Sequence, residues 1–191
     1  MTGYFWQGYK VRLRPTQPSD WEDWRRESSD SDGIRLMEWG IQLPVDDFNV
    51  REMSEKYDHF KDDYRKMFAI ETYSNQLAGL INLNTIDYKN GTFSFGLGTN
   101  RAYRNQGYAS EAVRIILRYG FHELRLQKCN SSCVDINEPS IKLHRKLGFR
   151  EEGLRRRVIY MNGRYYDNLL FGITKEEFDE NDQIYIANQE A

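Results

Sequence analysis

The sequence predicts a single domain of the α/β or α+β class, and three observations lead to this prediction. The chain has 191 residues, a length typical of one domain with a sizeable core. Turn signals join alternating segments into hairpins in the first half of the chain and again near its end. Between these hairpins, a strand pattern, an amphipathic helix and a second strand pattern follow one another in the order of a βαβ unit.

The charge and the cysteine content restrict the functional class. Twenty-seven basic and 29 acidic residues leave a net charge of −2, so we expect no nucleic-acid partner and no membrane surface. The chain has no long apolar run, and its start, MTGYFWQGYKVRLRP, lacks the apolar core of a signal peptide. Cys129 and Cys133 share one strand pattern, which excludes a zinc set and disfavours a disulfide. We therefore expect a cytoplasmic protein with no metal site and two packed thiols.

The first third of the chain contains a strand, a helix and a change in composition. Residues 9–14 alternate polar and apolar and end before a proline, which predicts a strand. Pro18-Ser19-Asp20 supplies an N-cap for a helix that contains two tryptophans. Acidic and small residues then make residues 28–48 a loop or a broken helix, and residues 50–66 have a charged, helical pattern.

The remaining elements follow from period-two patterns, hairpin turns and a helix stop. Lys89-Asn90-Gly91 is a strong hairpin signal, and Gly148 ends the helix before it. The expected strands cover residues 67–73, 77–87, 92–98, 128–136, 149–161 and 165–173, and the expected helices cover 109–123 and 138–147. We divide the chain into an N-terminal extension (1–9), one domain (10–175) and a polar, acidic, loosely held tail (176–191).

Residues 104–109, RNQGYA, stand at the entry of the central helix. Unpaired amides at a helix N-terminus bind anions, and Gly107 has no side chain that would keep a phosphate away from them. The spacing R-x-x-G-x-A therefore predicts a diphosphate cradle, with an ordinary loop-to-helix turn as the alternative. The apolar stripe that defines the helix recurs at three- and four-residue spacing and consists of Ala109, Ala112, Val113, Ile116, Leu117 and Phe121.

Two other phosphate-binding motifs are not present in complete form in the sequence. The chain contains no G-x-x-x-x-G-K-[ST] segment, which excludes a P-loop. Gly96-Leu97-Gly98 begins like a dinucleotide fingerprint, but Arg101 stands where the third glycine is required. A Rossmann-type nucleotide site is therefore disfavoured.

Two longer segments carry a family resemblance. The run TFSFGLGTNRAYRNQGYASEAVRIILRYGF and the later run VDINEPSIKLHRKLGF resemble the GNAT superfamily of acetyl-CoA-dependent N-acetyltransferases. The resemblance spans about residues 10–175 and is strongest to the branch that contains ribosomal-protein N-terminal and polyamine acetyltransferases. Residues 104–109 match the pyrophosphate loop of the family. Residues 137–140 and 146–149 match its second signature, a strand end, a helix and a turn.

The resemblance implies a mixed, mostly antiparallel sheet, flanked by helices, whose splayed central strand pair binds acetyl-CoA as co-substrate. The backbone at Leu97, Gly98 and Thr99 would bond the pantetheine arm, although a simple β-bulge is an alternative for the glycines there. Asn137 and Ser140 would reach the arm and the adenosine end, or serve as plain helix caps. Arg104 would add charge to the cradle, or could instead be a solvated surface arginine. The implied cradle residues are Arg104, Asn105, Gln106, Gly107, Tyr108 and Ala109.

The resemblance leaves the catalytic groups less defined. Many family members carry a carboxylate on the central strand, where this sequence has Ser94, so the usual base is missing. Many carry a tyrosine general acid where this sequence has His144, and histidine can protonate a thiolate near neutral pH. The alternative for His144 is a helix histidine that faces solvent or packs on a neighbour. Glu111, in the first turn of the central helix, is expected to be structural.

The acceptor is the least determined part of the prediction. The resemblance implies a primary amine as acceptor, which takes the acetyl group by direct attack on the thioester. The missing carboxylate favours a protein or peptide α-amine over a more basic polyamine. The alternatives are a polyamine or antibiotic-type amine acetyltransferase, or an acetyl-CoA-binding module without catalysis. Arg155, Arg156 and Arg157 point to an acidic substrate or to CoA phosphates, and a monomer and a homodimer are both compatible. The acidic loop that would suit a cation, or is simply solvated, contains Asp30, Asp32, Glu38, Asp46 and Asp47.

Overall fold

A computed structural model describes residues 4–41, 43, 44, 46, 48, 52 and 66–190. The helix expected over residues 50–66 falls, apart from residues 52 and 66, outside this part of the chain, as does Asp47.

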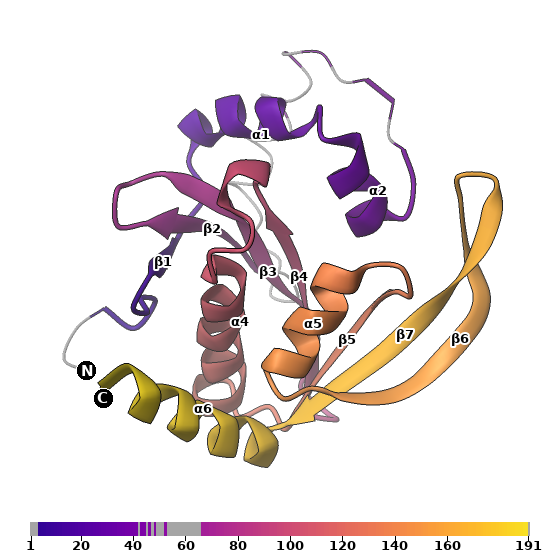
Figure 1. The fold of residues 1–191 in the computed structure, drawn as a ribbon. Helices are drawn as coiled ribbons and strands as arrows, with labels where there is room; N and C mark the ends of the chain where they lie inside the picture. The colour runs from indigo at the N-terminus through magenta and orange to yellow at the C-terminus, as the bar shows by residue number, and fades with distance from the viewer. Residues whose placement is uncertain are drawn as a thin grey trace.

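Seven strands form one sheet in the order β1-β2-β3-β4-β5-β7-β6 (Figure 1). All neighbouring strands are antiparallel except β4 and β5, which are parallel. The expected mixed, mostly antiparallel sheet is confirmed. The strands are β1 Val11–Arg14, β2 Lys66–Thr72, β3 Leu77–Asp87, β4 Thr92–Thr99, β5 Lys128–Val134, β6 Arg150–Met161 and β7 Arg164–Thr174.

Helices cover the sheet and cross its ends. In Figure 1, α4 and α5 lie in front of the sheet, α1 and α2 lie across its upper end, and α6 runs along the lower end. The helix expected over residues 109–123 is present, but its last turn is a π-helix. The helices are α1 Trp21–Glu27, α2 Ser31–Glu38, α4 Tyr108–Arg118, α5 Glu138–Lys146 and α6 Lys175–Glu190, with 3-10 turns at Pro18–Asp20 and Arg101–Tyr103 and the π-helix at Tyr119–Glu123. No helix in the described residues is both long and apolar enough to cross a bilayer.

The apolar stripe of α4 forms the centre of the hydrophobic core. Ala112, Val113, Ile116 and Leu117 have no exposed surface, and they pack in one cluster with side chains of the sheet. Phe121, on the following π-helix, packs edge-to-face on Phe93 of β4, with 5.2 Å between ring centroids. The helix that carries the expected cradle is therefore fixed rigidly against the sheet.

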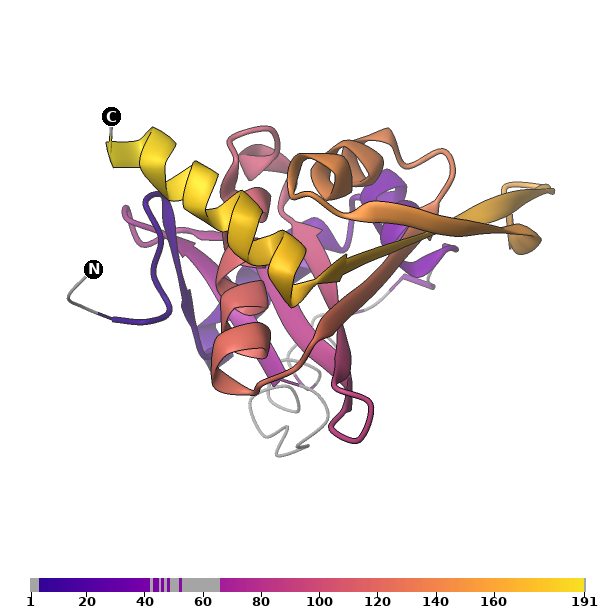
Figure 2. The same cartoon turned by 90° about the horizontal axis from the view of Figure 1, so that it is seen from below.

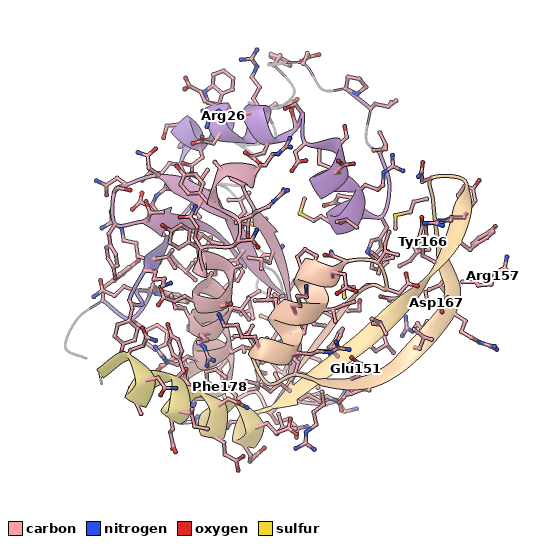
Figure 3. The ribbon with its side chains drawn as sticks, in the orientation of Figure 1. Arg26, Glu151, Arg157, Tyr166, Asp167 and Phe178 are labelled. Atoms are coloured by element: carbon pink, nitrogen blue, oxygen red, sulfur yellow. The ribbon has the colours of Figure 1, made fainter. Side chains whose placement is uncertain are left out.

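The β6–β7 hairpin extends beyond the body of the domain (Figures 1 and 2). The part of the hairpin next to its turn packs in a second, smaller apolar cluster, against which Leu36 of α2 also packs. Tyr166 lies in this cluster, whereas Arg157 lies at the exposed outer part of the hairpin (Figure 3). The small cluster consists of Val134, Ile159, Met161 and Tyr166.

The expectation of a loosely held C-terminal tail is wrong, because residues Lys175–Glu190 form α6. Phe178 of α6 has no exposed surface (Figure 3). Asp182 is buried and forms salt bridges with Arg114 and Arg118 of α4. A capping box starts the helix, since the Thr174 amide donates to the Glu177 carboxylate over 3.0 Å and the Glu177 amide donates to the Thr174 hydroxyl over 3.4 Å.

The N-terminal segment is fastened to α4 by Glu111. The carboxylate of Glu111 is 3% exposed and accepts the backbone N–H groups of Tyr9, Lys10 and Val11 over 2.7, 2.6 and 2.8 Å. It also accepts the Tyr185 hydroxyl of α6 over 3.0 Å. One buried carboxylate thus joins both ends of the chain to the first turn of α4, in agreement with the structural role expected for Glu111.

The acidic segment over residues 28–48 contains a regular helix, α2, rather than only loop. Asp30 is the N-cap of α2, because its side chain accepts the Gly33 amide over 3.2 Å. The charge of Asp30 therefore serves to begin a helix, which is a frequent use of aspartate.

Candidate active site

The central strands β4 and β5 separate part-way along their length. They pair only over residues 92–94 of β4 and 128–130 of β5. Beyond this point β4 continues to Thr99 and β5 to Val134 without pairing to each other. In the described residues no strand pairs with either backbone edge across this splay, and an extended ligand arm can bond such an edge in the manner of an added strand.

Leu97, Gly98 and Thr99 lie on the separated half of β4. On their other side they pair with Ile81, Leu80 and Gly79 of β3, and all three are half-buried. A Cβ atom at Gly98 would lie 3.0 Å from the sulfur of Met37, so α2 approaches β4 closely here.

The start of α4 is the segment predicted to form the cradle, and its role in binding a diphosphate stays a prediction. Gly107 is the N-cap with φ +84°, in the left-handed region, and its carbonyl accepts the Glu111 amide over 3.2 Å. The amides of Tyr108, Ala109 and Ser110 precede that bond and have no intrahelical acceptor. The backbone angle favours glycine, and a Cβ atom at position 107 would also lie 3.2 Å from the Lys10 ammonium nitrogen, so that side chain would have to shift slightly.

Two cations stand at the cradle, and the sequence prediction contained only one of them. Arg104 donates from Nε to the Thr99 carbonyl over 3.2 Å and forms a salt bridge with Asp30. Lys10 donates from Nζ to the Gln106 carbonyl over 3.2 Å. Nothing in the local pattern indicates Lys10, because the contact joins residues far apart in the sequence.

The other residues of the 104–109 loop act mainly through their backbone. Asn105 is exposed and left-handed, with φ 62°. The Gln106 amide group donates to the Ala102 carbonyl over 3.0 Å. Tyr108 is half-buried beside Tyr103, with ring centroids 6.3 Å apart, and Ala109 is also half-buried.

Asn137 and Ser140 lie at the junction between β5 and α5. Asn137 is the N-cap of α5, and its side-chain oxygen accepts the Ser140 amide over 3.2 Å. The helix-cap alternative is therefore seen directly for Asn137. A role of either residue toward a cofactor stays a prediction.

His144 of α5 is buried and hydrogen-bonded at both ring nitrogens. Only 2% of its surface is exposed, and its ring stacks on Phe171 of β7 with centroids 4.5 Å apart. Nδ1 lies 2.8 Å from the Ser140 carbonyl oxygen, and Nε2 lies 2.8 Å from the Ser131 hydroxyl. A carbonyl can only accept, so Nδ1 carries the proton and Nε2 accepts the hydroxyl of Ser131. Burial lowers the pKa of His144 below its usual 6.5, which keeps the ring neutral.

These contacts place His144 packed on a neighbour rather than facing solvent. As a direct proton donor it would need a second ring proton, and Ser131 stands at the nitrogen that would carry it. Its catalytic role therefore stays a prediction. Ser131 is a residue that the sequence reasoning missed, because a serine in a strand has no distinguishing pattern.

Ser94, which stands where many relatives have a carboxylate, belongs to an uncharged network between β3 and β4. Its hydroxyl contacts the Asn84 side-chain oxygen. The Asn84 amide donates to Asn82 over 2.6 Å, and the Gly96 backbone N–H donates to the same Asn82 oxygen over 2.8 Å. The network contains hydroxyl, amide and backbone groups and no ionised base.

The comparisons with known proteins agree with this geometry. The acetyltransferase (GNAT) domain family matches residues 10–150 of the chain. The chain belongs to the GNAT acetyltransferases. It is 39% identical over 177 residues, 93% of this chain and 97% of the relative, to the SPbeta prophage-derived uncharacterized N-acetyltransferase YokL of Bacillus subtilis. It is 28% identical over 171 residues, 89% of each chain, to the spermidine N(1)-acetyltransferase of Escherichia coli.

Solved structures show the same fold. An acetyltransferase of the GNAT family from Bacillus anthracis aligns with a TM-score of 0.76 and 27% identity, over 89% of this chain and 98% of that one. The protein is therefore an acyltransferase of the GNAT type that uses acetyl-CoA. The described residues contain no group of three His, Cys, Asp or Glu side chains that could hold a metal ion.

Proposed function

We propose that this GNAT enzyme acetylates the α-amine of a peptide or protein by direct attack of the amine on the thioester. The observation that carries the proposal is that two carboxylates beside the cofactor loop, Asp30 and Glu27, are already engaged. Asp30 is paired with Arg104 and caps α2, and the Glu27 carboxylate accepts the Arg101 backbone N–H over 2.8 Å. The acidic segment therefore offers a polycation less free charge than its sequence suggests.

The chemistry of the amine supports the same choice. A peptide α-amine has a pKa of about 8 and an alkylamine one of about 10, so the α-amine is partly neutral near pH 7.5 without help. The network around Ser94 holds no ionised base. A site of this kind suits the acceptor that needs the least deprotonation.

The charge of the hairpin also disfavours a polycation. Arg155 and Arg156 are exposed on β6, and Arg157 is stacked over Tyr165, with its guanidinium 5.3 Å from the ring centroid. A polypeptide with neutral or acidic residues after its N-terminus fits beside this positive strand better than a polyamine does.

For acetyl-CoA itself, we propose that the pantetheine arm occupies the splay and that the diphosphate lies at the start of α4. The open edges of β4 and β5, the unpaired amides after Gly107, and the cations of Lys10 and Arg104 fit a ligand with an amide arm and a diphosphate. When bound, acetyl-CoA supplies an activated acetyl group. The free, buried thiols of Cys129 and Cys133 support a reducing, cytoplasmic setting.

A polyamine is the second candidate, favoured by one further observation. The Asp135 Oδ1 atom is buried and has no hydrogen-bond partner in the described part of the chain. An isolated carboxylate oxygen is costly to bury, and an ammonium group of a polyamine would satisfy it. The similarity to a spermidine acetyltransferase points the same way.

A competition assay separates the two acceptors. The protein, acetyl-CoA and equal concentrations of spermidine and a short peptide with an N-terminal serine are incubated, and the products are measured by mass spectrometry. Acetylation of the peptide α-amine is the expected result. Acetylation confined to spermidine, together with its loss in Asp135→Asn, would establish the polyamine instead. Acetylation of neither would direct the search to small antibiotic-type amines.

A further inference from the structure

The hydroxyl of Ser131 stands where β4 and β5 part. Asn130 is the last residue of β5 that pairs with β4, so Ser131 is the first residue inside the splay. It is half-buried and pairs on its other side with Phe171 of β7, whose ring stacks on His144. The Ser131 hydroxyl is thus held between the open splay and a buried imidazole.

The imidazole behind Ser131 is a neutral base in uncharged surroundings. Besides Ser131 and Ser140, it contacts the rings of Phe95 on β4, Phe149 and Phe171. Cys133 lies two residues after Ser131 on the same face of β5, and burial raises the pKa of its thiol, so it is neutral at physiological pH. The carboxylates of Glu151 and Asp135 act on this thiol from a distance. The Ser140 carbonyl fixes the tautomer and leaves Nε2 as the acceptor for Ser131.

We propose that Ser131 exchanges protons with the reacting atoms and that His144 acts through it, so that the two residues carry the proton from the attacking amine to the departing sulfur. The inference deepens the proposed function and rests on the placement of the thioester in the splay. His144 is then not a direct acid, as the sequence suggested, but a base that accepts a proton from Ser131 and later returns it. Ser131 is the catalytic residue of the pair, and His144 is its positioning partner.

The step moves one proton from the amine to the sulfur and leaves both residues unchanged. The amine nitrogen forms a bond to the acetyl carbonyl carbon, and a proton on that nitrogen passes to the Ser131 oxygen as the Ser131 proton passes to His144 Nε2. The carbon–sulfur bond then breaks and its electron pair leaves with sulfur. The imidazolium returns its proton to the Ser131 oxygen, and the Ser131 proton goes to the thiolate. The amide and the free thiol are the products, and both residues end as they began.

The relative acidities of the imidazolium and the thiol favour transfer of the proton to the sulfur. A thiol has a pKa of about 8.5, whereas the pKa of His144 is lowered from 6.5 by its burial. The imidazolium is therefore the stronger acid, and transfer to the thiolate is downhill. The same burial keeps the ring unprotonated at neutral pH, so that it is ready to accept the first proton.

The test compares Ser131→Ala with Ser132→Ala, a matched control one residue along the same strand whose side chain faces the opposite side of the sheet. Turnover is measured with saturating acetyl-CoA and the amine that the wild type acetylates in the competition assay. We expect Ser131→Ala to lower turnover about 10²–10³-fold, with an acetyl-CoA dissociation constant, measured by calorimetry, within threefold of wild type. The control should stay within threefold in both quantities. His144→Gln and the double variant should lose no more than Ser131→Ala, because residues that act as a unit are not additive.

Two readouts separate this role from a structural one. Wild-type turnover should fall as pH drops through the pKa of His144, which burial lowers below 6.5, because the imidazolium cannot accept a proton; Ser131→Ala should lack this limb. Nitrogen NMR of histidine-labelled protein should show the Nδ1–H tautomer of His144 and a change at Nε2 in Ser131→Ala.

Equal turnover in the Ser131 and Ser132 variants would overturn the inference, as would an accumulating acetyl ester on Ser131, which would make it a nucleophile. These results require an active wild type. An inactive wild type that binds acetyl-CoA would instead reject the proposed function.

Discussion

Replacing Glu111 by glutamine is expected to loosen both chain ends from α4. Glu111 Oε2 accepts the amides of Lys10 and Val11, and Oε1 accepts the Tyr9 amide and the Tyr185 hydroxyl. Glutamine keeps one of the two acceptor oxygens. In place of the second oxygen it has an NH₂ group, which faces the two hydrogen-bond donors that this oxygen accepted.

The magnitude follows from the bonds that are lost. Two hydrogen bonds to a charged group are worth about 1.5–3 kcal/mol each, so Glu111→Gln should lower the free energy of unfolding by about 3–6 kcal/mol. Tyr185→Phe removes one of the four hydrogen bonds to this charge and leaves the three amides in place, so it should cost about 1.5–3 kcal/mol. Glu180→Gln, at an exposed position of α6, should change stability by less than about 0.5 kcal/mol.

Urea denaturation at pH 7 measures the three variants side by side. Because the Glu111 bonds also hold Lys10 beside the cradle, acetyl-CoA affinity measured by calorimetry should fall in Glu111→Gln as well. A Glu111→Gln protein as stable as the Glu180→Gln protein would show that the Glu111 carboxylate does not hold the chain ends on α4.

Three further predictions concern the cradle, its competing carboxylate and acid stability. Gly107→Val should weaken acetyl-CoA binding at least about tenfold in calorimetry, whereas Gly40→Ala, at a position in open space, should not change it. Equal affinities of the two variants would show that the start of α4 does not bind the diphosphate. Asp30→Asn should release Arg104 and tighten acetyl-CoA binding by up to about fivefold, the equivalent of an exposed salt bridge of up to about 1 kcal/mol, and weaker binding would contradict this. Burial would raise the pKa of Glu71, but hydrogen bonds from Arg14 and Arg12 outweigh it and lower that pKa below its usual 4.5. The stability that Glu71 contributes is therefore present above pH 4.5 and lost as pH falls through its lowered pKa, and urea midpoints of Glu71→Gln should depend less on pH in that range.

The sequence was sufficient where structure is determined locally. The apolar stripe of α4, the glycine at its N-cap and the hairpin turn near Gly91 are all short-range patterns. The bounds of β3 agree with the prediction at both ends. The splay between β4 and β5 was implied by family resemblance alone, because no local signal shows where two strands stop pairing.

The sequence was insufficient where single long-range polar contacts decide the structure. α6 has little apolar periodicity and is held by one buried phenylalanine, by Asp182 between two arginines, and by Tyr185 on Glu111. The capping box at Thr174 and Glu177 was the signal that could have revealed its start. Lys10 and Ser131 reach the site only through folding, so no spacing rule identifies them.

A crystal structure of the protein with bound CoA would show directly whether the cofactor lies in the splay and at the start of α4. We expect the diphosphate on the amides that follow Gly107, with the Lys10 and Arg104 side chains beside it. We also expect the pantetheine arm in the splay and the sulfur within about 3.5 Å of the Ser131 hydroxyl oxygen. A CoA molecule bound away from the start of α4, or with its sulfur out of reach of Ser131, would contradict the proposed cofactor site and the role of Ser131.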